Sequence, residues 1–399
     1  SNTNQLTQTA RFRLTALCPG INTISIELYR GNIFEAKIET SIQVTNLDEY
    51  NLTAITTQPR PVPQPDCILG VQTIRDKTSS YCTFHYHLKN FQIKSVSLEN
   101  NIFISTSIPN NWLEQAQQLL YSIIENTRGN FSQQSYLDIV SLGQDLFQHV
   151  FPQELQDYCR SVTPQELTLL IMEDQALNIP WEILHDGQYF LSERFIMGRW
   201  LWELNYIRPH EFPLGTVNVA YDAGVEQPEI WTRLIEIPEA PIPIILLNGL
   251  LENFGTSQTT KGLHFIHFSQ PSDALKILND SENLERQMRL VKLNLRSNRP
   301  LVTFSYVKNE IPGLTALGQN WALAFIRAGC SGFVGARWAI EPAVESAFIR
   351  SFYNCLWAGA SLGEAFYSSR QLARAVVPNV DWLAYVLYGD PMARPYLPV

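Results

Sequence analysis

The residues of this chain that could carry nucleophilic or metal-binding chemistry are few and mostly isolated. Six cysteines stand singly along the 399 residues: Cys18, Cys67, Cys82, Cys159, Cys330 and Cys355. No two of them have the close spacing that is typical of a zinc site. We therefore expect no structural metal and reduced thiols, with each cysteine serving as a small buried apolar side chain.

Two pairs of closely spaced histidines could act as general bases or as metal ligands. His85 and His87 stand two residues apart in an alternating segment, so they share one face of a predicted strand. They would make half of a metal site, but no third ligand is in view, and a polar sheet face is the preferred interpretation. The second pair, His264 and His267, lies within an apolar run of strand length.

The composition restricts the classes of function. With 45% hydrophobic and 17% charged residues the chain can fill a large core and is not a disordered protein. The net charge is -9 and basic runs are absent, which argues against nucleic-acid or anionic-membrane binding. No apolar run reaches the ~18 residues of a membrane helix, and no signal sequence opens the chain. We expect a cytoplasmic protein.

The first hundred residues show the period of β-strands. Ile24, Ile26 and Leu28 alternate with polar residues, and the alternation resumes after turns and again at Phe84 and Tyr86. The segment 58–65 holds four prolines and cannot pair centrally in a sheet. This pattern predicts a small all-β sandwich domain over residues 1–105 that serves contacts rather than chemistry.

The remainder alternates between helical and strand patterns. A connecting helix is predicted over 106–129, where Asn111 and Glu114 form a capping box. Beyond it, apolar runs of strand length alternate with helical segments at 167–172, 217–221, 263–268, 301–306 and 332–336. Strands that are apolar on both faces and alternate with helices indicate a mainly parallel α/β sheet, here over residues 130–399.

Several motifs of this α/β region resemble a CHAT domain, a family of caspase-like cysteine peptidases that often occurs beside TPR repeats. The resemblance rests on motifs that fall in order over about two-thirds of the chain: Ile179–Leu184, His185–Gly187, Trp321–Gly329, Phe333–Trp338, Gly359–Ala365 and Tyr388–Pro391. It implies a caspase-like fold in which a histidine and a cysteine follow the carboxyl ends of two adjacent parallel strands. Trp181 is expected to pack under the sheet, and Gly329 to end a helix in a left-handed conformation.

The histidine position of the family falls on Leu263–Ser269. Aligning His264 and Phe265 on the family's first His-Phe pair puts Phe268 at the catalytic position, whereas a shift by one residue puts His267 there. A one-residue slip reverses the face that a side chain occupies, so the two alignments exclude each other. We favour Phe268.

The cysteine position falls on Leu301–Asn309, and counting from its start places Val307 at the nucleophile. No cysteine lies between Cys159 and Cys330, so no other register restores one. Ser305 offers a hydroxyl, but it lies two residues early. The resemblance therefore implies a degenerate site, with Phe268, His267 and Val307 at the former catalytic positions.

We consequently expect a CHAT pseudopeptidase that binds a protein or peptide partner as a regulatory module, in a bacterial regulatory or defence system. Ligands of open α/β sheets bind at the carboxyl ends of strands. The candidates for lining such a cleft are His264, His267, Ser305, Arg337, Trp338 and Glu341. Two alternatives stay open: an active CHAT peptidase with a misplaced histidine-based site, and a purely structural scaffold in which the cleft is filled by its own side chains. No cofactor is expected, since the glycines lack a nucleotide-binding spacing, and both homo- and hetero-oligomers stay open.

Overall fold

The chain forms two compact units, residues 1–63 and 64–399, in a computed structural model. The structure describes residues 20–30, 33–44, 60–61, 63–75, 80–90, 101–127, 132–174, 179–202, 208–214, 217–221, 242–243, 265–269, 295–296, 299–305, 317–338, 340–376 and 379–396. Each unit is considered by itself.

The described strands of the first unit make one antiparallel sheet. They are β1 (Gly20–Arg30), β2 (Ile33–Val44) and β3 (Arg60–Pro61). The pairing of β1 with β2 shifts register once, between Leu28 and Tyr29. The short β3 brings Pro61 opposite Ala36 at the edge of this sheet, where a residue without an N–H group is tolerated.

The predicted boundary at residue 105 differs from the observed one. Strands β4 (Cys67–Arg75), β5 (Tyr81–Asn90) and β6 (Asn101–Pro109) join the sheet of the second unit, so residues 1–105 do not form a separate sandwich domain. Alternation identifies a half-buried strand but not the strand beside it, and this is why the sequence placed the boundary too late. A contact role for the first unit stays a prediction.

The second unit is built on one large sheet, described as eleven strands in the order β11-β10-β12-β13-β14-β15-β8-β7-β4-β5-β6. Besides β4 to β6 these strands are β7 (Thr168–Glu173), β8 (Ile196–Leu201), β10 (Val217–Tyr221), β11 (Ile242–Pro243), β12 (Phe265–Ser269), β13 (Leu301–Ser305), β14 (Gly332–Ala336) and β15 (Tyr385–Tyr388). A separate parallel pair joins β9 (Glu211–Pro213) to β16 (Arg394–Tyr396).

The large sheet consists of two parallel blocks that run in opposite directions. Strands β11, β10, β12, β13 and β14 are parallel, β15 is antiparallel to β14, and β15, β8, β7 and β4 are again parallel to one another. Only β5 and β6 continue in antiparallel fashion. The prediction of a mixed α/β fold with a mainly parallel sheet is confirmed.

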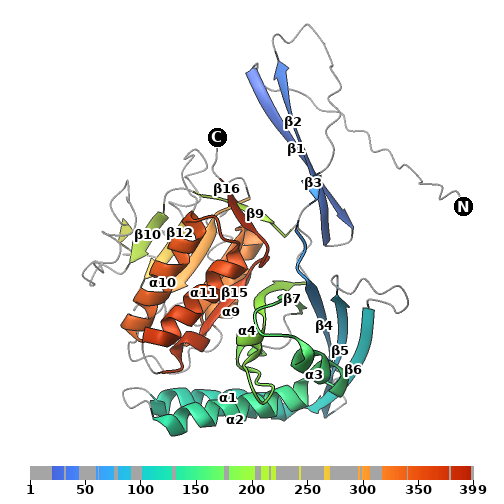
Figure 1. The fold of residues 1–399 in the computed structure, drawn as a ribbon, viewed down its shortest axis with the longest axis vertical. Coiled ribbons are helices and arrows are strands. Elements are labelled where there is room, and N and C mark those ends of the chain that lie inside the picture. Colours follow the sequence, from blue (N-terminus) through green and yellow to red (C-terminus); the bar gives the residue numbers. More distant parts are fainter. Residues whose placement is uncertain are drawn as a thin grey trace, which may run out of the picture. The chain divides into compact units, whose positions relative to one another are not determined.

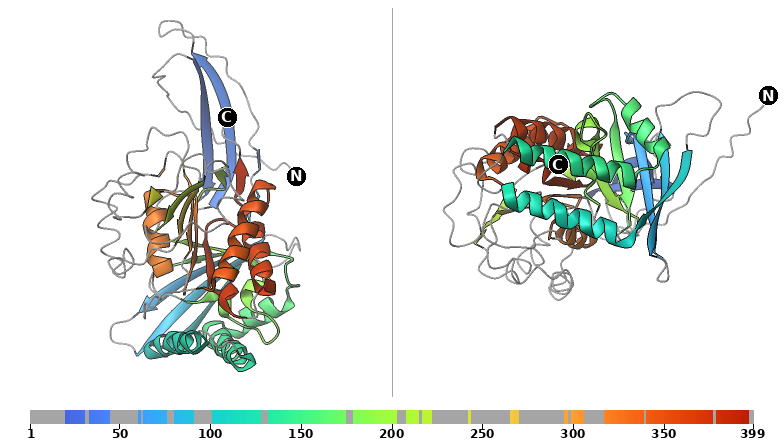
Figure 2. Two further views of the ribbon diagram at one scale, coloured as in Figure 1. Left: turned by 90° about the vertical axis from the view of Figure 1, so that its left-hand side faces the viewer. Right: turned by 90° about the horizontal axis from the view of Figure 1, so that it is seen from below.

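Helices cover both faces of the first block. In β13, the Thr303 side chain bonds Tyr353 of α10 (Pro342–Trp357), and the next residue, Phe304, stacks on Trp321 of α9 (Leu317–Ala328). Successive strand residues point to opposite faces, so α9 and α10 lie on opposite sides of the sheet. Helix α11 (Leu362–Val376) lies beside α10, as Figures 1 and 2 show.

A second pair of helices packs against β5 and β6. Helices α1 (Asn110–Thr127) and α2 (Gln133–Val150) lie side by side, and the Tyr86 hydroxyl of β5 donates to the Val150 carbonyl at 2.6 Å (Figure 2). The shorter elements are α3 (Gln153–Ser161), α4 (Leu191–Arg194), η1 (Trp181–Ile183) and η3 (Asp381–Leu383). Element α4 packs against η1 and β8, and η3 packs against α10, α11 and β15.

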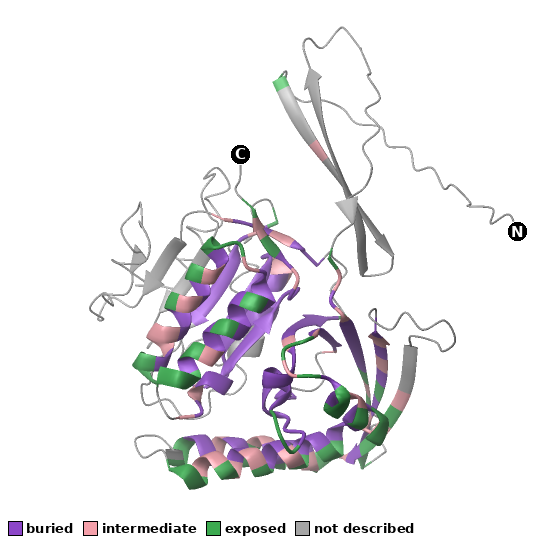
Figure 3. Cartoon of the chain, in the orientation of Figure 1, coloured by how far each residue is buried: buried purple, intermediate pink, exposed green. Residues whose placement is uncertain are grey.

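Burial follows these layers: strands β7, β14 and β15 are buried throughout, whereas β5 and β6 alternate between buried and more exposed residues (Figure 3). Trp181, expected to pack under the sheet, is fully buried, its indole N–H donates to Glu173 of β7, and its ring stacks on Phe151. Gly329 ends α9 with φ +106°, which confirms the predicted left-handed cap. In the described part of the chain, no helix has the length and apolarity required to cross a membrane.

Candidate functional site

The two strands that the sequence singled out are neighbours. Strands β12 and β13 pair in parallel, with His267 opposite Thr303, Phe268 opposite Phe304 and Ser269 opposite Ser305. The predicted adjacency of these strands is therefore confirmed for 265–269 and 301–305. Both strands end at the same edge of the sheet, and the pairing brings the backbones of Ser269 and Ser305 together there.

The expected site residues divide into those placed by the backbone and those outside the described residues. His267 and Phe268 lie in β12, and Ser305 is the last residue of β13. The side chains of these three residues lie outside the described part of the structure, as do His264 and Val307 entirely. Val307 follows the end of β13 by two positions.

The carboxyl half of β13 is enclosed on one face of the sheet by α10 and on the other by α9. Thr303 Oγ1 accepts a hydrogen bond from the Tyr353 hydroxyl at 3.1 Å, and both side chains are buried. Burial raises the pKa of the Tyr353 hydroxyl, which remains a proton donor at neutral pH. On the other face the Phe304 and Trp321 rings stack at 4.7 Å. Sequence reasoning missed Tyr353, because its spacing within an apolar helix face shows only that it is buried.

None of the described cysteines lies at the carboxyl ends of β12 and β13. Cys330 precedes β14 and so lies at the amino ends of these parallel strands, opposite to their carboxyl ends. It is 1% exposed, and burial raises the pKa of its thiol. Cys67 begins β4, bonds the Tyr158 hydroxyl at 2.8 Å, and burial raises the pKa of its thiol to about 11. A nucleophilic cysteine requires the opposite, a lowered pKa and access to the substrate. These two thiols are unsuited to that role.

The remaining cysteines lie on other elements. Cys159 of α3 and Cys82 of β5 are buried, and burial also raises the pKa of the Cys159 thiol. Cys355 of α10 is half-buried, and Cys18 lies outside the described residues. The prediction that cysteines are small buried side chains is confirmed for Cys67, Cys82, Cys159 and Cys330.

The candidates that follow β14 are committed to contacts inside the protein. Arg337 is buried, donates to the Ile179 carbonyl at 2.9 Å and lies 3.7 Å from a Glu182 oxygen. Trp338 is also buried, and its indole N–H donates to Asp381 at 3.2 Å. Glu341 is exposed, and its backbone N–H donates to the same Asp381 carboxylate at 2.9 Å. Packing, rather than an open cleft, accounts for Arg337 and Trp338.

A buried ion network surrounds the motif that contains Trp181. Arg199 of β8 donates to both carboxylate oxygens of Glu182, with an Nε–Oε1 distance of 2.8 Å, and its Nη1 lies 3.4 Å from Glu173 of β7. The Trp181 indole donates to the other oxygen of Glu173 at 2.5 Å. The network thereby joins η1 to two neighbouring strands of the second block.

The pKa values in this network follow from burial and charge. Burial alone would raise the pKa of Glu182, but Arg199 and Arg337 outweigh it and hold the pKa below its ordinary value. At Glu173 burial prevails over Arg199 and raises the pKa. Sequence reasoning missed both Glu173 and Arg199, although a single charge inside an apolar strand such as Ile196–Leu201 is a usable signal of a buried pair.

No metal centre is present among the described residues, in which no group of three His, Cys, Asp or Glu side chains has metal-binding geometry. His85 is exposed on β5 and His87 is half-buried two residues away, as expected for a polar sheet face.

Comparisons with known proteins identify no family for this chain. No family model matches it, and no curated protein does. Among solved structures it is similar to a chain of the Saccharomyces cerevisiae separase–securin complex, with 9% sequence identity and a TM-score of 0.47. That similarity covers 83% of this chain and 30% of the other. A second crystal structure of the same complex has a TM-score of 0.37 and 10% identity, over 72% of this chain and 22% of that one. The chain thus spans less than a third of the length of these two chains.

Proposed function

We propose that this protein is a CHAT-like, caspase-related pseudopeptidase that binds a protein or peptide partner without cleaving it. The observation that carries the proposal is the parallel pairing of β12 with β13, because this is the strand pair on which the resemblance places the catalytic histidine and cysteine. The chain has this pair but no cysteine anywhere between Cys159 and Cys330.

Binding rather than catalysis suits the residues at the former catalytic positions. Phe268 and Val307 carry no proton-transfer group and no nucleophile, and apolar side chains at a strand end favour contact with apolar groups of a partner. A regulatory or defence role in a bacterium, in the cytoplasm, is the further part of this proposal, which rests on the family resemblance alone.

An active hydrolase is the second candidate, and one observation favours it. Ser305 is the last residue of β13 and lies opposite Ser269, two residues beyond His267 on the neighbouring strand. A serine hydroxyl at the carboxyl end of one strand and an imidazole on the next are the two groups that a serine nucleophile and its base require.

Covalent labelling of the full chain separates the two candidates. The protein is incubated with a fluorophosphonate, which modifies activated serines, and with iodoacetamide, and its intact mass is measured. We expect no fluorophosphonate adduct and no hydrolysis of a peptide library. A fluorophosphonate adduct that disappears in both Ser305→Ala and His267→Gln, but persists in the exposed control His85→Gln, would establish the hydrolase instead.

Restoring the missing pair tests how far the site has diverged. We expect Val307→Cys combined with Phe268→His to give no efficient peptidase, because a thiol also needs a lowered pKa and a base within ~3 Å. Ser269 stands where the family has glycine, and an oxyanion hole that depends on such a turn contributes ~3 kcal/mol. Thiol-dependent cleavage of the peptide library by the double variant, and not by Val307→Cys alone, would contradict this expectation.

A further inference from the structure

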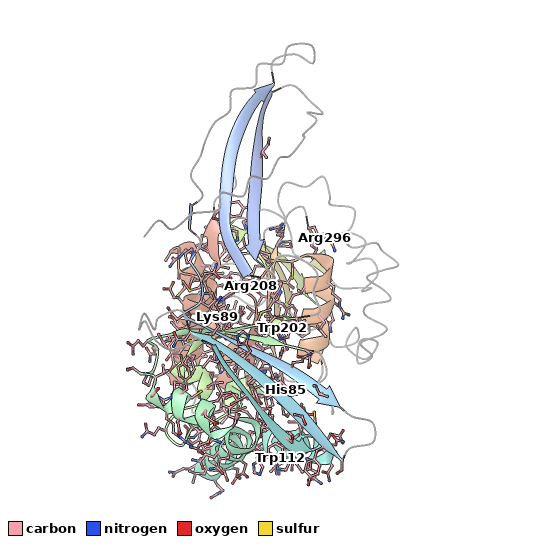
Figure 4. All side chains as sticks on the ribbon, turned by 90° about the vertical axis from the view of Figure 1, so that its right-hand side faces the viewer. His85, Lys89, Trp112, Trp202, Arg208 and Arg296 are labelled. Atoms are coloured by element: carbon pink, nitrogen blue, oxygen red, sulfur yellow. The ribbon has the colours of Figure 1, made fainter. Side chains whose placement is uncertain are left out.

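Strand β6 forms an outer edge of the described part of the large sheet. It is the last strand of the sheet order, it pairs with β5 over nine residue pairs, and no bulge interrupts their register. Figure 1 shows β6 as the outermost arrow beside β5, and Figure 4 views the molecule from this side, with His85 labelled on β5. A long regular strand at a sheet edge presents a row of backbone groups to whatever lies beside it.

The pairing shows which backbone groups of β6 face outward. The Asn110 N–H, directly after β6, donates to the Ser80 carbonyl at 2.9 Å, so this residue bonds toward β5. Bonding directions alternate along an antiparallel strand. The N–H and C=O groups of Asn101, Phe103, Ser105 and Ser107 therefore face away from β5.

The sequence of β6 lacks the features that usually protect an edge. Its nine residues, NIFISTSIP, include no charge, and its one proline is the last residue. Ser105 and Ser107 are exposed, while Ile108 is buried against the core. Natural edges are normally blocked by lysine, an internal proline or a bulge, and none of these occurs within β6.

We propose that β6 pairs with β6 of a second copy of this chain, antiparallel and across a two-fold axis at Ser105. A strand of similar length with its own outward-facing backbone groups satisfies such an edge, and β6 itself is one. Pairing centred on Ser105 matches Phe103 with Ser107, so outward-facing residues meet outward-facing residues. At each end of the pairing Asn101 meets Pro109, which has no N–H group and offers only its carbonyl as an acceptor. Because β6 is uncharged, this symmetric pairing places no like charges opposite each other.

The test is the mass of the full chain in solution, measured by light scattering after size-exclusion chromatography. We expect a dimer for the wild type and a monomer for Ser105→Lys, which brings two ammonium groups together at the axis. Gln118→Lys adds the same charge at an exposed position of α1 and is expected to leave the dimer intact. A monomeric wild type, or a dimeric Ser105→Lys, would refute the proposal.

Cross-linking provides a measurement that does not depend on disrupting the edge. Directly opposed residues in a hydrogen-bonded antiparallel pair have Cα atoms about 5.5 Å apart, which lies within the range that a disulfide spans. Ser105→Cys is therefore expected to form a disulfide-linked dimer under mild oxidation, whereas Gln118→Cys and the wild type stay unlinked. Equal cross-linking of all three proteins, with unchanged circular dichroism, would show that β6 is not the contact.

Discussion

At the scale of single residues, the most consequential feature is the buried pairing of Arg199 with Glu182. Both side chains are at most 2% exposed, and Arg337 approaches the same carboxylate. Removing charges from water is costly, and the cost is recovered only while each charge keeps its partner. Loss of the Glu182 charge would therefore leave Arg199 and Arg337 buried without one of their partners.

Glu182→Gln tests this dependence. The substitution leaves two guanidinium groups buried beside a neutral amide, and we expect it to lower the free energy of unfolding by about 3–5 kcal/mol, as measured by urea denaturation. The control is Asp157→Asn, which removes an exposed ion pair with Arg160 at 3.6 Å and should change the value by less than about 1 kcal/mol. Equal losses in the two variants would show that burial does not set the cost.

His185 predicts a pH dependence of stability. Burial holds the pKa of this imidazole below its ordinary value, so the unfolded chain takes up the proton more readily than the folded one. The contribution of neutral His185 is fully present above pH ~6.5, the unfolded pKa, and is lost as the pH falls through the folded pKa. Its Nδ1 accepts a hydrogen bond from the Gly187 N–H at 3.1 Å, which also requires the neutral ring.

We expect His185→Gln to flatten the decline of unfolding free energy below pH 6.5, as measured by urea denaturation at a series of pH values. The comparison concerns the slope and not the level, because the variant also alters packing against Phe190. His85→Gln, which removes an exposed imidazole, is the control. If the unfolding free energy of His185→Gln falls with pH as steeply as that of the wild type, groups other than His185 cause the decline.

At the scale of elements, the end of α9 shows how a helix is fitted to the loop before β13. Gly329 has φ +106°, and a Cβ placed on it would come within 2.4 Å of the Arg296 Cγ and 2.9 Å of the Arg296 backbone nitrogen. The Leu295 N–H donates to the Ala328 carbonyl at 2.7 Å, so the preceding segment is tied to this turn. Glycine is required here both for its conformation and for the close approach.

Substituting two glycines separates these requirements. Gly359 ends α10 with φ +86° and has open space where a Cβ would lie, so Gly359→Ala should cost about 1–2 kcal/mol from backbone conformation alone. Gly329→Ala adds a clash with backbone and should cost clearly more. Thermal and urea unfolding of both variants measure the difference. Equal losses of unfolding free energy in the two variants would mean that the segment around Arg296 moves away and relieves the clash.

At the scale of the whole molecule, the chain divides at residue 63 rather than at 105. Strand β4 lies between β5 and β7 in the large sheet, and its buried Leu69 and Val71 belong to the same core as Phe84 and Ile108. A fragment that begins after β5 loses an inner strand of the sheet, whereas one that begins after Pro63 keeps the sheet intact.

Two fragments test the division. We expect residues 64–399 alone to be folded, with cooperative thermal unfolding and the near-ultraviolet circular dichroism of buried tryptophans. Residues 106–399 should aggregate or lack a cooperative transition, because removal of β4 and β5 exposes β7 and uncovers the inner faces of α1 and α2. A cooperative transition in the shorter fragment would restore the predicted boundary at 105.

The sequence by itself determined the local features of this protein. A short continuous apolar run identified β14 at its observed bounds, and glycine after an apolar helix identified the cap at Gly329. The absence of any cysteine between Cys159 and Cys330 is likewise a property of the sequence, and it bears on function only because β12 and β13 are adjacent.

Only the tertiary structure decided the partners. Strands β5 and β6 have the same alternation whether they form a sandwich or extend a parallel sheet, because alternation indicates a buried face and not the neighbouring strand. Arg337 resembled a cleft residue until its contacts with Ile179 and Glu182, more than 150 residues earlier, were known. A side chain's role depends on what lies opposite it, and residues so distant in the chain meet only when the whole sheet has formed.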